Sequence, residues 1–158
     1  MSLPVSFDVR KSLIALQPGL YEEVRDDEDR AMVLRRLGNK PARRLSPAEL
    51  RELIARGMAL SYTVPLAIEL LIDEPFLEAQ RHPGDLLTTV LEVDSRFWID
   101  REDLWLAMIP VLETAVETIN ARVAEEEHAD YLPWHLGDDF MAALLHFRSI
   151  HGTGEPAE

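Results

Sequence analysis

Apolar side chains recur at helical spacing over the longest regular stretch of the chain. One side of an α-helix would carry Leu104, Met108, Leu112, Ala115, Ile119 and Val123, which are three or four positions apart. Asp100, with Asp103 three positions on, is expected to cap this helix, and Pro110 is expected to kink it. A helix with one broad apolar side needs other elements to cover it, so this stripe constrains the rest of the fold.

Two shorter segments carry helix start and stop signals. Ser46-Pro47-Ala48-Glu49 reads as a capping box with proline at the first helical position, and Gly57 is expected to end that helix with a positive φ. Thr63 is expected to cap a second helix, with Pro65 in its first turn. This helix is almost wholly apolar from Leu66 to Ile72, which predicts a central position in the core.

The segment Arg81-His82-Pro83-Gly84-Asp85 places a histidine and an aspartate on either side of Pro-Gly. It could be a catalytic or metal-binding pair, or the place where a helix starts. The apolar residues that follow, up to Leu91, recur at helical spacing. This pattern favours the helix start, with Pro83 opening the helix and Asp85 interacting favourably with its dipole.

The remaining segments complete a helical pattern. Further helices are expected at Val9–Leu16, at Ala31–Leu37 and through Phe140 to Ile150, and residues 94–98 are expected to form a connecting turn whose aromatic pair packs back into the core. No segment shows sustained strand alternation, and there is no repeat. We therefore predict an all-α fold, a single-domain helical bundle or layered helical domain over residues 1–158, with a disordered tail at 152–158.

The chain is strongly acidic, with a formal charge of −13. Nucleic-acid binding needs clustered Lys and Arg at the phosphates, so this charge argues against that class. A basic partner fits it better, although an acidic surface is equally a route to solubility. The charge is also uneven. Residues 40–57 hold five basic and two acidic side chains, residues 121–158 hold two basic and eight acidic ones, and Asp26–Asp29 form a second acidic run.

Several classes of protein are disfavoured by what the sequence lacks. It contains no cysteine, which rules out a disulfide framework, a thiolate nucleophile and a Cys-based zinc site. The N-terminus has no basic region followed by an apolar one, and no apolar run approaches the roughly 18 residues of a membrane span. We therefore expect a cytoplasmic protein that uses neither a membrane nor a cofactor.

Motifs of catalysis are also missing, since no stretch matches a phosphate-binding loop, a nucleophile elbow or a zincin helix. His146 and His151 are five positions apart and do not share a helical face cleanly. His128 and His135 could join carboxylates in a metal-dependent hydrolase, which stays open as an alternative. Surface or capping roles are the plainer interpretation of all five histidines.

Several motifs follow one another in order between Leu37 and Trp98. They read Leu45-Ser46-Pro47-Ala48-Glu49-Leu50-Arg51-Glu52-Leu53-Ile54-Ala55-Arg56-Gly57, then Val64-Pro65-Leu66-Ala67-Ile68-Glu69, then Pro83-Gly84-Asp85-Leu86-Leu87. In this order they resemble the immunity proteins of contact-dependent growth inhibition (CDI) systems. The chain outside residues 37–98 resembles the family little, so we expect the family-like core there.

The resemblance implies a cytoplasmic, non-enzymatic protein that binds and neutralises the C-terminal toxin domain of a cognate CDI effector. Toxins of these systems are often nucleases, whose phosphate-holding surfaces are basic. We therefore expect a basic nuclease domain as the partner, steered onto the acidic inhibitor by charge. An acidic helical adaptor or regulatory subunit of another complex remains the alternative, followed by the metal-dependent hydrolase.

The expected toxin-binding residues combine charge with aromatic anchors. The charged candidates are Asp26, Asp27, Glu28, Asp29, Glu125, Glu126, Glu127, Asp130, Asp138 and Asp139. Tyr131 and Trp134 are the expected anchors, in a segment flanked by the acidic residues. A tryptophan folded back over the core is an equally good interpretation of Trp134.

Overall fold

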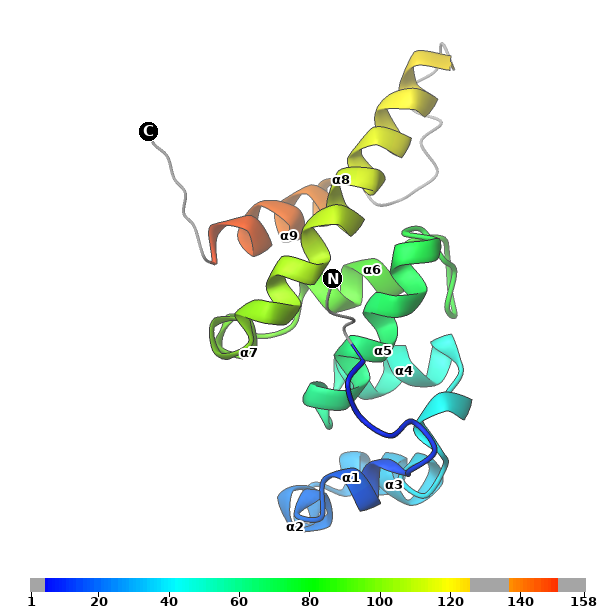
Figure 1. Cartoon of the computed structure of the whole chain (residues 1–158), viewed down its shortest axis with the longest axis vertical. Helices are drawn as coiled ribbons and strands as arrows, with labels where there is room; N and C mark the ends of the chain where they lie inside the picture. The colour runs from blue at the N-terminus through cyan, green and yellow to red at the C-terminus, as the bar shows by residue number, and fades with distance from the viewer. Residues whose placement is uncertain (1–4, 126–136, 151–158) are drawn as a thin grey trace.

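The computed structural model describes residues 5–125 and 137–150 of the 158-residue chain. Within these ranges the regular backbone is helical, apart from two isolated bridges, Ser12 with Pro41 and Glu78 with Pro83. The predicted all-α fold is therefore confirmed. The elements are α1 (Leu13–Leu16), α2 (Leu20–Val24), α3 (Glu28–Leu37), the 3-10 helix η1 (Ala42–Arg44), α4 (Pro47–Ala55), α5 (Leu60–Asp73), α6 (Asp85–Leu91), α7 (Ser95–Asp100), α8 (Glu102–Glu125) and α9 (Gly137–Ser149) (Figure 1).

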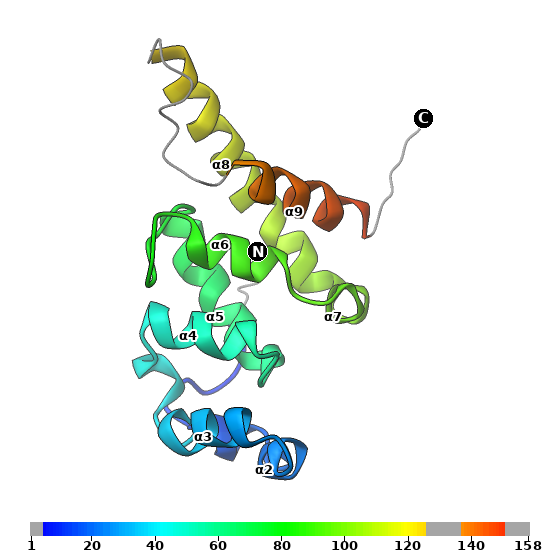
Figure 2. The ribbon, with the colours of Figure 1, turned by 180° about the vertical axis from the view of Figure 1, so that it is seen from behind.

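The helices form layers along the longest axis of the molecule. Helices α1 to α3 lie at one end, α4, α5 and α6 form the middle with α7 to one side of it, and α8 extends from α7 to the other end with α9 beside it (Figures 1 and 2). Buried apolar side chains form two groups, an N-terminal cluster from α1 to α5 and a C-terminal cluster from α4 to α9. The two clusters meet at α4, where Leu50 and Leu53 belong to the first and Ile54 to the second.

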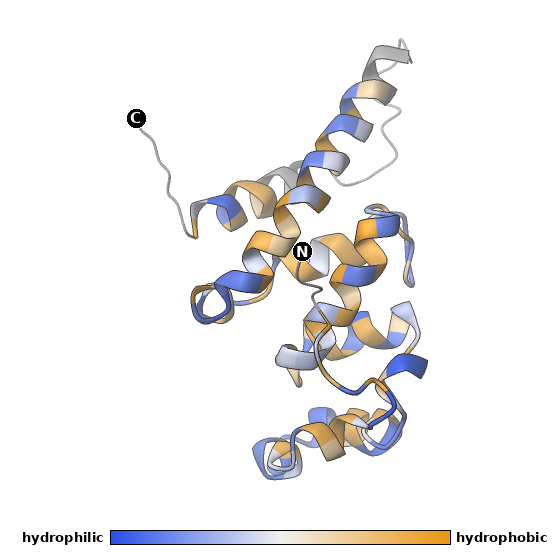
Figure 3. Ribbon diagram, viewed as in Figure 1, coloured by the Kyte–Doolittle hydropathy of each residue, from blue (hydrophilic) through white to orange (hydrophobic). Residues whose placement is uncertain are grey.

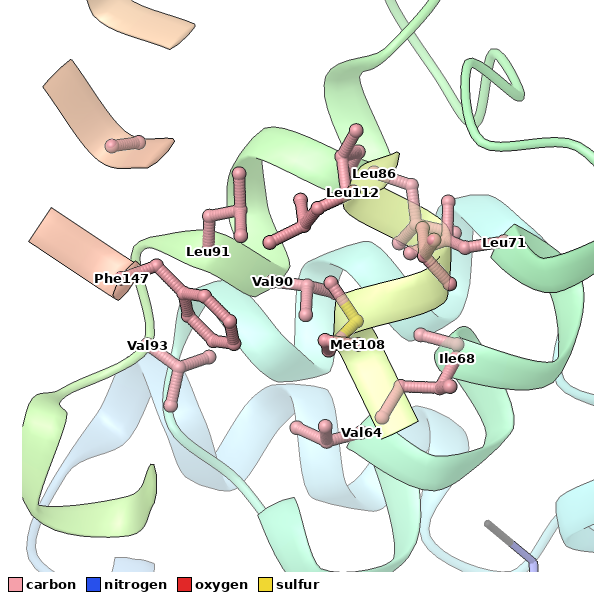
Figure 4. Packing of buried hydrophobic residues seen from close by; sticks show 14 of the residues in the cluster. Val64, Ile68, Leu71, Leu86, Val90, Leu91, Val93, Met108, Leu112 and Phe147 are labelled. Carbon is pink, nitrogen blue, oxygen red and sulfur yellow. The ribbon is translucent and has the colours of Figure 1, made fainter. Parts of the chain in front are cut away.

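The C-terminal cluster is where the longest helix packs. Figure 4 shows side chains of α5, α6, α8 and α9 converging, among them Ile68, Val90, Met108 and Phe147. The predicted stripe of α8 is buried from Leu104 through Met108 and Leu112 to Ala115. Apolar residues colour the inner sides of these helices in Figure 3. Each fully buried large side chain contributes about 2 kcal/mol through the hydrophobic effect, so this interface holds the C-terminal layers together.

By length and composition alone, helix α8 is also long and apolar enough to cross a membrane, a weak signal that core helices of other folds share. Its Glu102–Ala121 segment has a mean hydropathy of 1.2 over its most apolar 18 residues, and 28% of these residues are buried. No other helix in the part of the chain that the structure describes passes the same test. The buried stripe accounts for part of this hydropathy, because core helices need an apolar side.

The capping box of α4 is confirmed. The hydroxyl of Ser46 accepts a hydrogen bond from the backbone N–H of Glu49 at 3.1 Å, and the Glu49 carboxylate accepts one from the backbone N–H of Ser46 at 2.9 Å. Lys40 donates to the same carboxylate at 2.7 Å. The hydrogen bond from Lys40, followed by the one from Ser46, lowers the pKa of Glu49. Gly57 has the expected positive φ, 67°.

The start of α5 differs from the sequence prediction. The helix begins at Leu60, and its N-cap is Ala59, whose φ of 51° lies in the left-handed region. The backbone N–H groups of Tyr62 and Thr63 both donate to the Ala59 carbonyl at 2.9 Å, which closes the first turn there. Thr63 is buried inside the helix, where its hydroxyl donates back to the carbonyls of Met58 and Ala59. The predicted cap at Thr63 is therefore wrong.

The connection from α6 to α8 also differs in part. Residues 95–100 form the short helix α7, capped by the Asp94 carboxylate, instead of a simple turn. The predicted return of an aromatic residue to the core is confirmed for Trp98, which is fully buried. Helix α8 begins at Glu102, and the carbonyl of Arg101 accepts its first hydrogen bonds. The Asp103 carboxylate pairs with Arg101 at 3.0 Å, so the predicted side-chain cap by Asp100 and Asp103 is not formed.

Aromatic contacts attach α9 to the rest of the C-terminal layer. The ring of Phe147 meets Trp98 edge to face, with 4.8 Å between centroids, and stacks on Trp105 at 5.9 Å. The indole N–H of Trp105 donates to the Phe147 carbonyl at 3.0 Å. Phe147 is fully buried, so α9 is fixed to both α7 and α8 through one residue.

The aspartate of the Arg81–Asp85 segment has a structural role that its position in the sequence does not reveal. Helix α6 starts at Asp85 after Gly84, whose φ is 87°, and Pro83 lies before the helix instead of opening it. The Asp85 carboxylate is 2% exposed and accepts hydrogen bonds from three successive backbone N–H groups, at residues 79, 80 and 81, over 2.7 to 2.9 Å. Nε of Arg51 on α4 lies 3.8 Å away.

This carboxylate therefore joins three parts of the fold: the loop before α6, the start of α6 and α4. Arg51 strengthens the junction, because its Nη1 donates to the side-chain oxygen of Gln80 at 3.1 Å. A buried charge is stable only when hydrogen bonds and opposite charge replace its water. Here three N–H groups and a guanidinium do so, and the helix-start interpretation of this segment is confirmed.

Replacing Asp85 with Asn should destabilise the fold. The amide keeps one acceptor oxygen but turns an NH₂ group toward backbone N–H donors, so the free energy of unfolding should fall by about 2–3 kcal/mol. Thermal unfolding followed by circular dichroism should show a Tm lower by about 5–10 °C. Glu78→Gln, an exposed change in the same loop, is the matched control and should stay within about 0.5 kcal/mol of wild type. Equal Tm values for the two variants would contradict the proposed role.

The stabilisation by Asp85 should also depend on pH. Burial alone would raise the pKa of this carboxyl, but hydrogen bonds from the backbone of Arg81, Ala79 and Gln80, with the charge of Arg51, hold it below its ordinary value. Such a carboxyl stabilises the fold above its unfolded pKa, about 3.9, and the effect is lost as pH falls through the folded pKa. The stability difference between wild type and Asp85→Asn should therefore be constant from pH 7 to about pH 5 and shrink below about pH 4. Urea unfolding at each pH measures this; a constant difference down to pH 2 would argue against it.

Candidate functional site

The formal charge of the chain is divided unequally near Gly57. Residues 1–57 carry 11 basic and nine acidic side chains, a formal charge of +2, whereas residues 58–158 carry five basic and 20 acidic ones, a formal charge of −15. The first group supplies most of the N-terminal cluster, and the second supplies α5 to α9 (Figure 1). The layers therefore turn an uneven sequence into a molecule with one acidic end.

The predicted acidic run Asp26–Asp29 lies at the other, weakly charged end, where α3 begins. Asp27 caps α3, since its carboxylate accepts a hydrogen bond of 3.1 Å from the backbone N–H of Arg30. Asp29 is ion-paired, with 2.9 Å between its Oδ2 and Nε of Arg56 on α4. The carboxylates of the other two members are exposed and pair with no described residue. Half of the run therefore has a structural role.

Ion pairs continue from Asp29 across the surface between α3 and α4. Nη1 of Arg56 lies 3.7 Å from Oε2 of Glu52, and Nη2 of Arg36 lies 2.6 Å from the same oxygen. These side chains surround a hollow of about 440 Å³, which Met32 also lines with half of its surface exposed. Partly exposed pairs of this kind contribute at most about 1 kcal/mol each. The hollow thus has mixed charge, and its carboxylates are already neutralised by arginines of the same chain.

The other predicted contact residues are placed in part or not at all. Outside the described residues lie Glu126, Glu127, Asp130, Tyr131 and Trp134. The backbone alone places three more: Glu125 ends α8, and Asp138 and Asp139 lie in the first turn of α9. A toxin-binding role for these eight residues, including the two aromatic anchors, stays a prediction.

The acidic end carries exposed carboxylates that the sequence prediction did not include. Within residues 58–121, where side chains are described, no hydrogen bond or ion pair to another described group is formed by the carboxylates of Glu69, Asp73, Glu74, Glu78, Glu92, Glu102, Glu113 and Glu117. Large apolar side chains are exposed on the same helices, including Ile72 at 51% and Leu106 at 53%. Exposed apolar groups rimmed by polar residues are a feature of surfaces that bind proteins, and unpaired charge steers a partner of opposite charge.

A sequence signal for these residues exists on α8. Glu113 and Glu117 are four positions apart, and both fall on the side of the helix opposite the buried stripe through Met108, Leu112 and Ala115. The buried stripe marks the inner side of the helix, and the opposite side is open to a partner.

A second hollow, of about 340 Å³, lies between α6 and α9. It is lined by Leu91 and Glu92 from the end of α6 and by Ala142, Ala143 and His146 of α9. It contains one carboxylate and one imidazole, so it is less acidic than the outer side of α8. The side chains that line it are mostly small and apolar.

Metal binding finds no geometric support in the part of the chain described, which contains no group of three or more His, Cys, Asp or Glu side chains arranged to hold a metal ion. The histidines of the hydrolase alternative, His128 and His135, lie outside the described residues, as does His151. That alternative therefore stays a prediction.

Comparison with known proteins relates this arrangement to one family. A family model described as CDI immunity proteins matches residues 18–107, more than half of the chain. The match extends the predicted family-like core of residues 37–98 in both directions, so that it takes in α2, α3 and the first turns of α8. No curated protein and no solved structure matches the chain. Because one continuous match covers more than half of the chain and contains all of its family-like motifs, the chain belongs to the family of CDI immunity proteins.

Proposed function

We propose that this protein acts in the cytoplasm, where it binds the C-terminal toxin domain of a cognate CDI effector and neutralises it without catalysis. Membership of the family supports toxin neutralisation in general. Neutralisation by direct binding is supported physically, because the acidic end offers unpaired carboxylates and exposed apolar side chains together.

The toxin we propose is a basic nuclease domain. The observation that carries this proposal is the formal charge of −15 on residues 58–158. A nuclease holds phosphates with Lys and Arg side chains, so its substrate-binding surface is positively charged. An acidic protein can be steered to that surface and compete with nucleic acid for it.

Mixing the purified protein with the toxin domain of the effector encoded beside it should give a stable complex. We expect the complex to elute as one species in gel filtration and the toxin's nuclease activity to fall in proportion to the amount of added protein. A toxin domain from an unrelated system is the control, and it should be neither bound nor inhibited. If the cognate toxin forms no complex and stays active, direct neutralisation is wrong.

Charge steering makes a separate prediction about rates. Association should slow by about tenfold or more between 20 mM and 500 mM salt, whereas the dissociation rate should change little. Surface plasmon resonance at several salt concentrations measures both rates. An association rate independent of salt would show that the acidic end does not guide the encounter.

A further inference from the structure

The outer side of α8 is the surface of this protein that most resembles an unoccupied binding face. Opposite the buried stripe, the exposed residues include Glu102, Leu106, Pro110, Glu113 and Glu117, which follow one another at spacings of four, four, three and four. These spacings place them along one side of the helix. We call these five residues the outer face of α8.

More of α8 is apolar than the fold covers. Its segment Glu102–Ala121 has the mean hydropathy of a buried helix, yet only 28% of its most apolar 18 residues are buried. Leu106 is 53% exposed in the middle of the first half of the helix. An exposed leucine alone needs no explanation, but one on the apolar helix of an otherwise acidic end can serve as an anchor for a partner.

The glutamates of the outer face point to the charge of that partner. Glu113 and Glu117 are exposed, four positions apart on one helix side, and neither pairs with a described basic side chain. Like charges at this spacing destabilise a helix. A surface of opposite charge would relieve this repulsion, whereas the carboxylates of the α3–α4 hollow already have arginine partners.

A lipid surface fits the outer face less well than a basic protein does. Helices that lie on membranes carry Lys and Arg on the polar side, where they meet anionic headgroups. The outer face of α8 carries three glutamates and no basic residue. Its charge therefore favours Lys and Arg side chains of a protein.

We propose that the outer face of α8 docks against a basic surface of the cognate toxin domain, with Leu106 as the apolar contact and Glu113 and Glu117 as the paired charges. This inference rests on the proposed function and specifies which surface performs it. It places the interface on α8 in the acidic layer, away from the predicted acidic run at the start of α3.

Charge reversal at two sites tests the location. The double variant Glu113→Lys/Glu117→Lys should slow association with the cognate toxin domain by about tenfold or more at low salt. The matched variant Asp26→Lys/Glu28→Lys changes the net charge by the same amount at exposed, unpaired positions of the other end, and should slow it by less than about threefold. Surface plasmon resonance on the full chain measures both, and circular dichroism checks that both variants fold.

Shortening the side chain of Leu106 tests the apolar contact. Leu106→Ala should raise the dissociation rate by about five- to tenfold while leaving association nearly unchanged. Met32→Ala, which shortens a similarly exposed apolar side chain on α3 at the other end of the molecule, is the matched control and should leave both rates within about twofold.

The outcomes separate the two proposals. If wild type does not bind the toxin domain at all, the proposed function fails. If wild type binds but both charge variants are weakened equally, or only the α3 variant is weakened, the proposed function stands and docking on α8 is wrong. Binding of the wild-type chain to vesicles of phosphatidylcholine and phosphatidylglycerol, lost in Leu106→Ala, would also overturn it in favour of a lipid surface.

Discussion

Helix α5 is the constraint on which the fold depends, because its residues 63–68 are buried in succession and most of its sides must therefore be covered. Its residues Val64, Ile68 and Leu71 lie in the C-terminal cluster, while Leu66 lies in the N-terminal one. Helices α4, α6 and α8 all contact it. A helix that is apolar on most of its sides has to be covered on those sides. The layered arrangement follows, with α1 to α3 on one side of the middle layer and α7 to α9 on the other.

The buried carboxylate of Asp85 fixes how the middle layer joins its neighbours. It holds the three backbone N–H groups of residues 79–81 and lies beside Arg51, so the loop before α6, α6 itself and α4 are positioned together. Helix α6 in turn contacts α9, which Phe147 fixes to α7 and α8. The acidic end is thus attached to a rigid frame, as a surface that must present charge in a constant geometry requires.

The separation of charge along the molecule connects this frame to a function. Near the N-terminal cluster, most carboxylates cap helices or pair with basic side chains, and the net charge is small. Beyond Gly57 there are four acidic residues for each basic one, and most of the carboxylates described there, within residues 58–121, pair with no other described group. For a protein of the CDI immunity family, such a surface supports the proposal of a basic toxin as the partner. The outer face of α8 adds to this charge an exposed apolar residue, which charge alone does not supply.

Local features could be predicted from the sequence alone. The capping box at Ser46, the positive φ of Gly57, the buried stripe of α8 and the all-α class depend on residues within a few positions of each other, and the family motifs are also continuous in sequence. Tertiary structure decided the rest. Thr63 became a buried residue of α5 instead of its cap, and Asp85 turned its carboxylate to a loop instead of its own helix. Asp29 pairs with Arg56, 27 positions away, whereas Glu113 and Glu117 on α8 pair with no described basic side chain. The physical reason is that hydrogen bonds and ion pairs are decided by which groups the packing of distant helices brings within about 3 Å.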